Sequence, residues 1–461
     1  MGNAKYIGRV GALAVALGIG VGLVSTPWVA AAKPKSPDTN QTTNSSAEKA
    51  PKPEKNIAVS KNGEIVRQSG TASAYTPSGS TGTKARATGD GATATVTSGS
   101  KSRATATGTG ATATAGGGTK NSAKANGDGS TAAAGDDMTA TGSNNNNNTA
   151  RASGENSQAY AGSGGSGNNN NKATVDGNNS QAYAGANGSG NNNNTATVTG
   201  DTTTGTPGDN SIASAGSLGD GNNDNTARAV GSDAFAFAGG GVAPSPTFPA
   251  GGPGNDSSGN VATATSTGTG TTLAVAGAIG DNNDNNKATA TNSGTDSDTE
   301  AGAGLRGDNN SGNTATATNT GDNAFTEAAS GFRTHDSTGN TATVTNNGDG
   351  ANTTAVAGYL GGNNNNNTVT GTNAGNDAIS QIFAGVIGDN NSGNTATLNN
   401  SGEGATTRAY AAYNGDNNTN NSAAATNSGD NNTTEAGAGV NSDGNDGLNV
   451  TATDGQINNE P

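Results

Sequence analysis

The stretch GNTATVTNNGDGANTTAVAGYLGGNNN, residues 339–365, decides the fold because the chain repeats its pattern at a fixed spacing. The first Thr of its TAT triplet, Thr341, has an equivalent position every 27 residues in both directions. These equivalent positions are Thr314, Thr341, Thr368, Thr395 and Ser422. A fixed period of this length is typical of repeat architectures, in which each unit packs only against its neighbours.

The composition leaves little material for a core of large side chains. Only 29% of the 461 residues are hydrophobic and 3% are aromatic, whereas Gly alone occupies 76 positions. Such chains are disordered by default, because they bury too little apolar surface to offset the loss of chain entropy. A largely disordered low-complexity chain is therefore the alternative to any folded interpretation.

The charge and the absence of Cys exclude several classes of partner and site. The formal net charge is −14, which disfavours binding to nucleic acid or to an anionic membrane surface. Without Cys, the chain has neither a disulfide framework nor a thiolate metal site.

The N-terminus has the three parts of a secretory signal peptide. Lys5 and Arg9 precede an uncharged apolar run at residues 10–24, and the stretch WVAAAK, residues 28–33, then offers a small-residue cleavage site at Ala32. The pattern predicts a signal peptide over residues 1–32, with cleavage after Ala32. The apolar run is too short for a membrane span of about 20 residues. We therefore expect a secreted or cell-envelope protein with no membrane span after the leader is removed.

The leader YIGRVGALAVALGIGVGL, residues 6–23, resembles those of mycobacterial exported proteins, several of which are repetitive. This resemblance covers about the first 32 residues and implies export alone.

Composition divides the rest of the chain into five segments. Residues 33–56 are rich in Pro and predict a disordered linker. Residues 57–84 predict a hairpin cap and lead-in, because Asn62-Gly63 separates two short β-type runs. Repeats of shorter period, 19 and 23 residues, occupy 85–238, and repeats of about 27 residues occupy 260–461. Between them, the Pro- and Gly-rich residues 239–259 predict an insertion loop.

Each repeat has the same order of segments: a short strand such as TATAT, a Gly-acid turn, a second small-residue strand and a Gly/Asn loop. Side chains of a strand alternate between faces, so the Ala residues of each strand point one way and the Thr residues the other. In the 27-residue register one inner column reads Ala288, Ala315, Ala342, Val369, Ala396, Ala423 and Val450. We predict an all-β, two-strand-per-coil β-solenoid of 19–27 residues per coil, held by backbone hydrogen bonds and Asn ladders and lengthened mainly in its outer Gly/Asn loop.

The outward Thr residues form the first candidate site. The array comprises Thr289, Thr314, Thr316, Thr318, Thr341, Thr343, Thr345, Thr368, Thr370, Thr395 and Thr397. It resembles the T-x-T ranks of ice-binding β-solenoids, and the resemblance implies ordering of water at an ice plane. Lys287, Asn399 and Ala424 interrupt the ranks. The competing interpretation is that Thr is simply a good residue for exposed strands.

The acidic turns form the second candidate site. Stacked carboxylates repel one another unless a hard cation bridges them, and calcium prefers such oxygen ligands. The candidate ligands are Asp281, Asp308, Asp322, Asp349, Asp389, Asp416 and Asp430. The competing interpretation is that Gly-Asp and Gly-Asn pairs are common turn formers.

We see no constellation of catalytic residues in the sequence. The only His, His335, lies alone in the loop RTHDS, which predicts a solvent-exposed position. We therefore expect a non-enzymatic, exported structural protein of the cell surface or matrix. Multivalent weak contacts would bind it to itself or to cell-envelope polysaccharide. The alternatives are an ice-binding protein and a self-assembling functional amyloid. Its Asn files resemble those of curlin-like repeats, although the recurrent Ser and Gln of those repeats are missing.

Overall fold

The computed structural model describes residues 55–461, apart from 137–141, 201–209, 242–253, 278–279 and 332. The expected signal peptide with its cleavage site at Ala32 lies outside the described residues, as does nearly all of the expected linker 33–56. Of the expected insertion 239–259, only the two ends are described.

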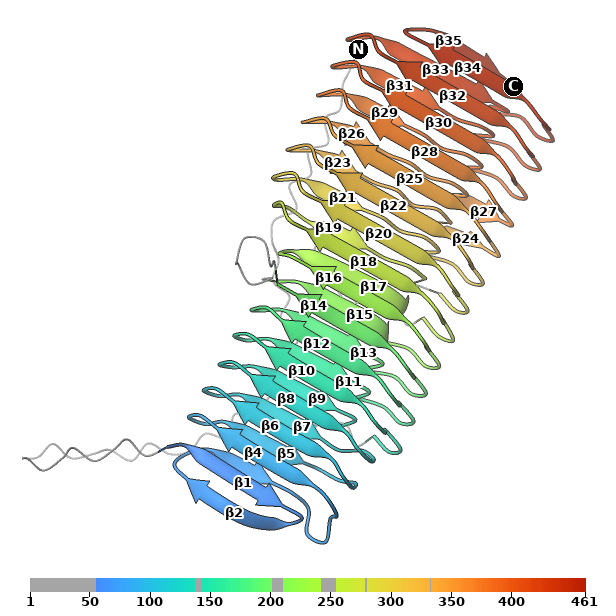
Figure 1. The fold of residues 1–461 in the computed structure, drawn as a ribbon. Coiled ribbons are helices and arrows are strands. Elements are labelled where there is room, and N and C mark those ends of the chain that lie inside the picture. Colours follow the sequence, from blue (N-terminus) through green and yellow to red (C-terminus); the bar gives the residue numbers. More distant parts are fainter. Residues whose placement is uncertain (1–54, 137–141, 201–209, 242–253, 278–279, 332) are drawn as a thin grey trace, which may run out of the picture. The chain divides into compact units, whose positions relative to one another are not determined.

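The described residues fold into strands and turns and contain no helix (Figure 1). The first sheet has 17 strands and the second has 16, and a third sheet pairs β24 with β27. In pairing order the first sheet comprises β2 (Glu64–Ser69), β1 (Ile57–Lys61), β4 (Lys84–Thr88), β6 (Arg103–Thr107), β8 (Ser122–Asn126), β10 (Thr149–Ser153), β12 (Lys172–Asp176), β14 (Thr195–Thr199), β16 (Thr226–Val230), β18 (Val261–Ser266), β20 (Lys287–Asn292), β22 (Thr314–Asn319), β25 (Thr341–Asn346), β28 (Thr368–Asn373), β30 (Thr395–Asn400), β32 (Ser422–Asn427) and β34 (Asn449–Thr453).

The second sheet comprises β3 (Ser73–Tyr75), β5 (Thr93–Val96), β7 (Thr112–Ala115), β9 (Thr131–Ala134), β11 (Gln158–Ala161), β13 (Gln181–Ala184), β15 (Ile212–Ser217), β17 (Ala234–Gly240), β19 (Thr272–Ala274), β21 (Asp298–Glu300), β23 (Phe325–Thr326), β26 (Asn352–Thr353), β29 (Ile379–Gln381), β31 (Thr406–Ala409), β33 (Thr433–Ala438) and β35 (Ile457–Glu460). The third comprises β24 (Arg333–His335) and β27 (Leu360–Gly362).

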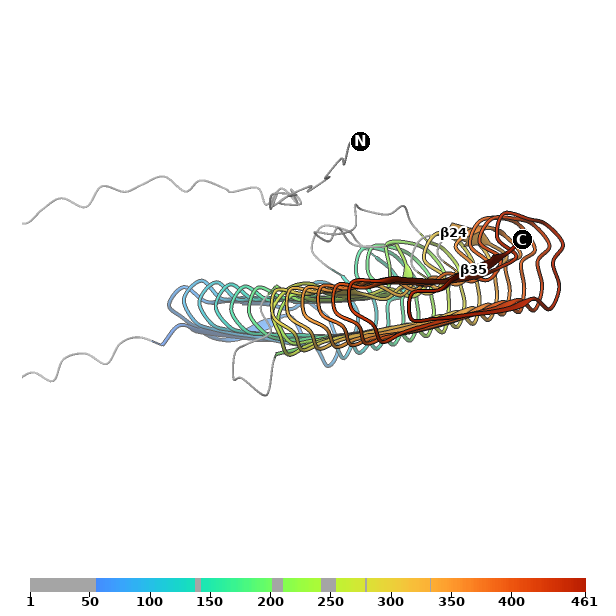
Figure 2. The same ribbon diagram turned by 90° about the horizontal axis from the view of Figure 1, so that it is seen from above.

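Successive coils pair in parallel and in the register that the repeat predicts. Thr314 of β22 lies opposite Thr341 of β25, which lies opposite Thr368 of β28. The strands of the second sheet pair in the same way, one per coil. The predicted β-solenoid is confirmed. Figure 2 shows the coils one after another, with the 27-residue coils (yellow to red) larger in outline than the first ones (blue).

A hairpin closes the first sheet at the end nearest the N-terminus. Strand β1 is antiparallel both to β2 and to β4, and these are the only antiparallel pairs among the described strands. The turn between β1 and β2 places Asn62 and Gly63 at φ 50° and 91°, the left-handed region that an Asn-Gly turn requires. The hairpin covers an edge that would otherwise present unpaired backbone groups.

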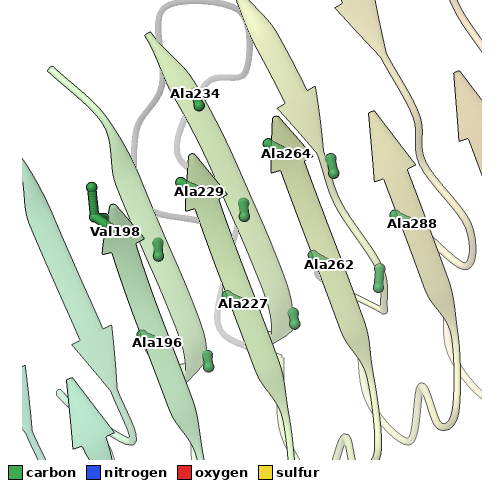
Figure 3. Packing of buried hydrophobic residues seen from close by; sticks show 14 of the residues in the cluster. Ala196, Val198, Ala227, Ala229, Ala234, Ala262, Ala264 and Ala288 are labelled. Atoms are coloured by element: carbon green, nitrogen blue, oxygen red, sulfur yellow. The ribbon is translucent and has the colours of Figure 1, made fainter. Parts of the chain in front are cut away.

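The core is a double layer of small side chains between the two sheets. In the first sheet Ala196, Ala227, Ala262 and Ala288 follow one another in register, and each is fully buried (Figure 3). The Ala positions of the second-sheet strands belong to the same buried cluster. Ala permits close approach of the sheets, so the core is thin and backbone hydrogen bonds must supply much of the stability.

Some of the larger apolar residues gather in two further places, whereas others, such as Ile382 and Leu398, belong to the main core. Phe235, Phe237, Leu273, Val275 and Leu305 form a second buried cluster. The 27-residue period also aligns Leu305 with Phe332, which lies outside the described residues, and with Tyr359, Val386, Tyr413 and Val440. Val386 is buried in this file, whereas Tyr359, Tyr413 and Val440 are only partly buried.

The Asn-rich segment before each first-sheet strand is part of the interior, which corrects the expectation of an outer loop. Its N-x-x-N motif, for example Asn310 and Asn313, places two fully buried Asn side chains in every typical coil. Asn340 Nδ2 donates to Asn313 Oδ1 at 3.1 Å, and its backbone N–H donates to the same oxygen at 3.0 Å. The repeat lengthens by adding an interior polar ladder, in which the buried Asn side chains form hydrogen bonds to a neighbouring coil.

Candidate functional site

The predicted Thr array lies on the outer face of the first sheet. Its side chains alternate with the buried Ala residues and are partly or fully exposed. Register places them in three columns. These are Thr314, Thr341, Thr368 and Thr395; Thr289, Thr316, Thr343, Thr370 and Thr397; and Thr318 and Thr345.

The array is continuous over three coils and broken at its ends. Strands β22, β25 and β28 each present three outward Thr residues. Lys287 precedes this block in the first column, and Asn399 and Ala424 follow it in the other two. The result is a short grid of hydroxyl and methyl groups with a row spacing of about 4.8 Å.

The second sheet also has a buried file of five Thr residues and one Ser, which the sequence analysis did not identify. Thr299, Thr326, Thr353, Ser380, Thr407 and Thr434 are fully buried and stack in register. Thr407 Oγ1 and Thr434 Oγ1 donate to Asn400 Oδ1 and Asn427 Oδ1, at 3.2 and 3.1 Å. The sequence contained a signal for this file, because each of these residues lies two positions before a member of the buried column that begins at Ala301 and therefore shares its face of the strand.

The predicted acidic turns form two exposed files, the first in register with His335 and Gly362 of the third sheet and the second in the turns that follow the first-sheet strands. Asp281, Asp308, Asp389 and Asp416 precede the strands, and Asp322, Asp349 and Asp430 follow them. Each carboxylate accepts a hydrogen bond from the backbone of the preceding coil. Asp281 N donates to Asp308 Oδ1 at 2.9 Å, and Glu403 N donates to Asp430 Oδ1 at 2.9 Å.

These contacts give the acidic turns a structural explanation that needs no cation. Asp322 Oδ1 accepts the N–H of Thr295 at 2.7 Å, and this hydrogen bond lowers the pKa of the Asp322 carboxyl. Within the described ranges, no group of three or more His, Asp or Glu side chains comes together as a metal site. The seven Asp residues thus form two files, and each carboxylate accepts a hydrogen bond from a backbone N–H group.

His335 belongs to the first of these files. Its Nδ1 accepts the backbone N–H of Asp308 at 3.1 Å, as an Asp carboxylate does in other coils. Nδ1 also lies 3.8 Å from Asp308 Oδ2, and both side chains are more than half exposed. His335 therefore substitutes for Asp as a turn acceptor, and its imidazole is solvent-accessible, as the sequence predicts.

Three carboxyl groups in or directly after strands of the second sheet have raised pKa values. Burial and repulsion from Asp298 and Glu327 raise the pKa of Glu300 to about 8. Burial and repulsion from Asp298 raise the pKa of Glu327 to about 7. Burial raises the pKa of Asp298 to about 6. Sequence reasoning missed this cluster, although Glu300 and Glu327 stand one 27-residue period apart.

Aromatic side chains stack between coils in two places. Tyr160 and Tyr183 stand in register on β11 and β13, with parallel rings and centroids 5.3 Å apart. Phe383, Tyr410 and Tyr413 form a triangle with centroid distances of 5.2–5.6 Å. These stacks fix the lateral alignment of neighbouring coils.

In the part of the chain that the structure covers, no helix is long and apolar enough to cross a membrane. The chain matches no protein-family model, no curated protein and no solved structure.

Proposed function

We propose that the chain is an exported, non-enzymatic structural protein of the cell surface or matrix that acts through multivalent contacts. The observation that carries this proposal is the register of the coils: the same outward side chains recur in one direction, coil after coil, on one continuous sheet. A face of this kind multiplies a weak contact by the number of coils that take part. The acidic balance and the leader-like N-terminus support export, and self or cell-envelope polysaccharide is the proposed partner.

The first experiment tests export. The full chain is expressed in a mycobacterial host, and the culture medium, envelope and cytoplasm are assayed for it. We expect a mature protein that begins at residue 33 in the medium or envelope. A cytoplasmic protein that retains Met1 would contradict the proposal.

The second experiment tests multivalency. Deleting residues 314–394 removes three coils and joins Asn313 to Thr395 in register. The shortened chain should keep its β spectrum but bind isolated envelope polysaccharide, or itself, more weakly. Equal binding by the two chains would locate the contact in one coil and refute multivalency.

A second candidate function is ice binding, which the Thr grid of β22, β25 and β28 favours. Purified protein would then inhibit ice recrystallisation. Thr343→Lys, at the centre of the grid, should abolish the inhibition, while Thr433→Lys, exposed on the second sheet, should leave it unchanged. Absence of inhibition by the natural chain would remove this candidate.

A further inference from the structure

Charge is distributed very unequally along the stack of coils. Residues 55–172 contain 11 Lys and Arg against 6 Asp and Glu, whereas residues 173–461 contain 5 against 27. The first part of an acidic protein is therefore basic. The place of these cations on the fold indicates what kind of partner they fit.

The cations of the first part gather on the outer face of the first sheet. Strands β4, β6, β8, β10 and β12 are neighbours in the stack (Figure 1), and each presents at least one exposed Lys or Arg on this face. We define the basic file as Lys84, Arg86, Arg103, Lys124, Arg151 and Lys172. Each is the first or third residue of its strand, so the file follows the half of the face where the strands begin. With neighbouring strands about 4.8 Å apart, the file extends over about 19 Å.

The members of the basic file repel one another. Lys84 lies directly opposite Arg103, and Lys124 lies directly opposite Arg151. Like charges at directly opposite positions destabilise a sheet. Neither of the two ion pairs among the described residues involves a member of the file. The file therefore costs stability in the free protein, and an anionic ligand would relieve this cost.

The acids nearest to the basic file do not neutralise it. Asp176 is the only acid at an outward position of β4 to β12, and it stands at the far end of its strand. Beyond the first member of the file, Glu64 lies opposite Lys61, which separates it from Lys84. The remaining acids of these coils lie in the turns after the strands, and they are Asp90, Asp128 and Glu155. The Asp128 carboxylate already accepts the backbone N–H of Thr109 at 2.7 Å. Among the described residues, the file is thus left without a partner of opposite charge.

We propose that the basic file binds a linear anionic polysaccharide whose carboxylate groups repeat along the chain. The cations repeat with the coils, about every 4.8 Å, and one pyranose residue has a similar length. A polyuronate that lies along the stack therefore offers about one carboxylate to each coil. Lys supplies a point charge, and Arg binds a carboxylate through two parallel hydrogen bonds. This inference rests on the proposed function, of which it specifies the polysaccharide.

The shape and chemistry of the file favour this ligand over other polyanions. The cations form a narrow line, because the last residue of each strand, such as Thr107 or Asn126, carries no positive charge. A planar anionic membrane would gain contacts along this line only. Proteins bind single-stranded nucleic acid with aromatic side chains that stack on the bases, and none of the outward residues of β4 to β12 is aromatic. Beyond β12 the outward residues of the first sheet include no acid, so the sheet face does not repel a longer polysaccharide.

Isothermal titration calorimetry with the full-length chain tests the proposal. The probes are oligomannuronates, which carry one carboxylate per sugar residue, and dextran, which is uncharged. We expect the oligomannuronates to bind in about 0.1 M salt, where charges act over about 10 Å, and to be released in about 1 M salt, where charges act over about 3 Å. Affinity should increase with length up to about five sugar residues, because the file spans five coils. Absence of binding in about 0.1 M salt, or equal binding of dextran, would overturn the proposal.

Two quadruple variants of equal net charge locate the contact. The first removes cations of the file and carries Arg103→Gln, Lys124→Gln, Arg151→Gln and Lys172→Gln. The second removes four exposed cations elsewhere and carries Lys55→Gln, Arg228→Gln, Lys287→Gln and Arg333→Gln. Far-UV circular dichroism verifies that both are folded. The first should bind the oligomannuronates about tenfold more weakly, because four exposed charge contacts of modest strength are lost together. The second should bind like the natural chain, and equal affinities of the two variants would overturn the assignment of the surface.

A charge-retaining variant keeps the test valid if the first variant does not fold. Lys84→Arg, Lys124→Arg and Lys172→Arg preserve every charge of the file, so this triple variant should still bind. Loss of binding by the folded triple variant would contradict recognition through charge. Single-stranded DNA and phosphatidylglycerol vesicles are the competing anions. Tighter binding of either one than of oligomannuronate would overturn the choice of a polysaccharide.

The outcomes separate this inference from the proposed function. An exported chain that does not bind oligomannuronate would overturn the inference alone. A chain that binds oligomannuronate through the basic file but stays in the cytoplasm would overturn the proposed function alone.

Discussion

Asn400 Nδ2 donates a hydrogen bond to Asn373 Oδ1 at 2.7 Å, across one full coil of 27 residues. Its own Oδ1 accepts from Asn427 Nδ2 at 2.9 Å and from Thr407 Oγ1 at 3.2 Å. Both Asn400 and Asn373 are fully buried. A continuous ladder of this kind joins coils that share few large apolar contacts.

Removing one Asn side chain from this ladder should destabilise the protein strongly. Asn400→Ala leaves the amide of Asn427 and the carbonyl of Asn373 without their partner, at a cost of about 2 kcal/mol in the free energy of unfolding. The neighbouring Asn399 is exposed, so Asn399→Ala is the matched control and should change the stability little. Equilibrium denaturation in urea measures both. Equal effects of the two substitutions would mean that the buried ladder contributes nothing specific.

Gly371 should accept a methyl group. It lies in an inner column between Val344 and Leu398. A Cβ there would meet Ile382 Cγ1 at 3.4 Å and Val344 Cγ2 at 3.6 Å, which are ordinary contact distances. Gly371→Ala should therefore stabilise the fold by about 0.5–1 kcal/mol, because it also restricts the unfolded chain. In contrast, Gly375→Ala would bring a Cβ to 2.0 Å from Gly402 O and should destabilise it. Thermal melting of both variants decides whether the two glycines differ in this way.

The Asp322 carboxylate should accept its hydrogen bond from the backbone of Thr295 whether or not calcium is present. Its pKa is lowered by the hydrogen bond from Thr295, so its contribution to stability is present above the unfolded pKa and is lost as pH falls. Asp322→Asn keeps the acceptor and should melt near the natural chain, whereas Asp322→Ala should melt lower. We expect the melting temperature in EDTA to equal that in calcium. A lower melting temperature in EDTA, restored by calcium, would support the calcium hypothesis instead.

The carboxyl groups of Glu300 and Glu327 should make the protein less stable at alkaline pH. Their folded pKa values, about 8 and about 7, lie above the value of about 4.3 in unfolded chains. The folded state therefore binds more protons between these limits, and stability falls as pH rises from 5 to 8. The double variant Glu300→Gln/Glu327→Gln should flatten this dependence and melt at a higher temperature than the natural chain at pH 8.

Glu403, exposed in a turn, supplies the control for the pH series. Glu403→Gln should leave the pH dependence of the melting temperature unchanged. A natural chain whose melting temperature is constant from pH 5 to 8 would disprove the assignment to Glu300 and Glu327.

The periodicity of the sequence was sufficient to predict the coil, its register and its Ala-lined interior. Strand alternation is local, so the inward and outward positions of β22 follow from TATATN alone. The buried N-x-x-N ladder was misassigned to a loop because Asn favours turns, and only the neighbouring coil supplies the partners that allow its burial.

The candidate sites were predictable in position and less so in chemistry. The repeat alone places the Thr residues in columns and the Asp residues in files. The hydrogen bond from Thr295 to Asp322, however, depends on the exact path of a turn, which no pattern of residue types specifies. The raised pKa of Glu300 likewise depends on how far its side chain is buried.

The antiparallel hairpin of β1 and β2 has a consequence for how the chain matures. It is formed from neighbouring residues, so it needs nothing that is synthesised later, and β4 pairs directly with it. Each later coil can then pair with the preceding coil, which has already folded. We therefore expect the chain to fold in the order in which it leaves the ribosome or an export channel, one coil at a time, with no step that waits for its far end.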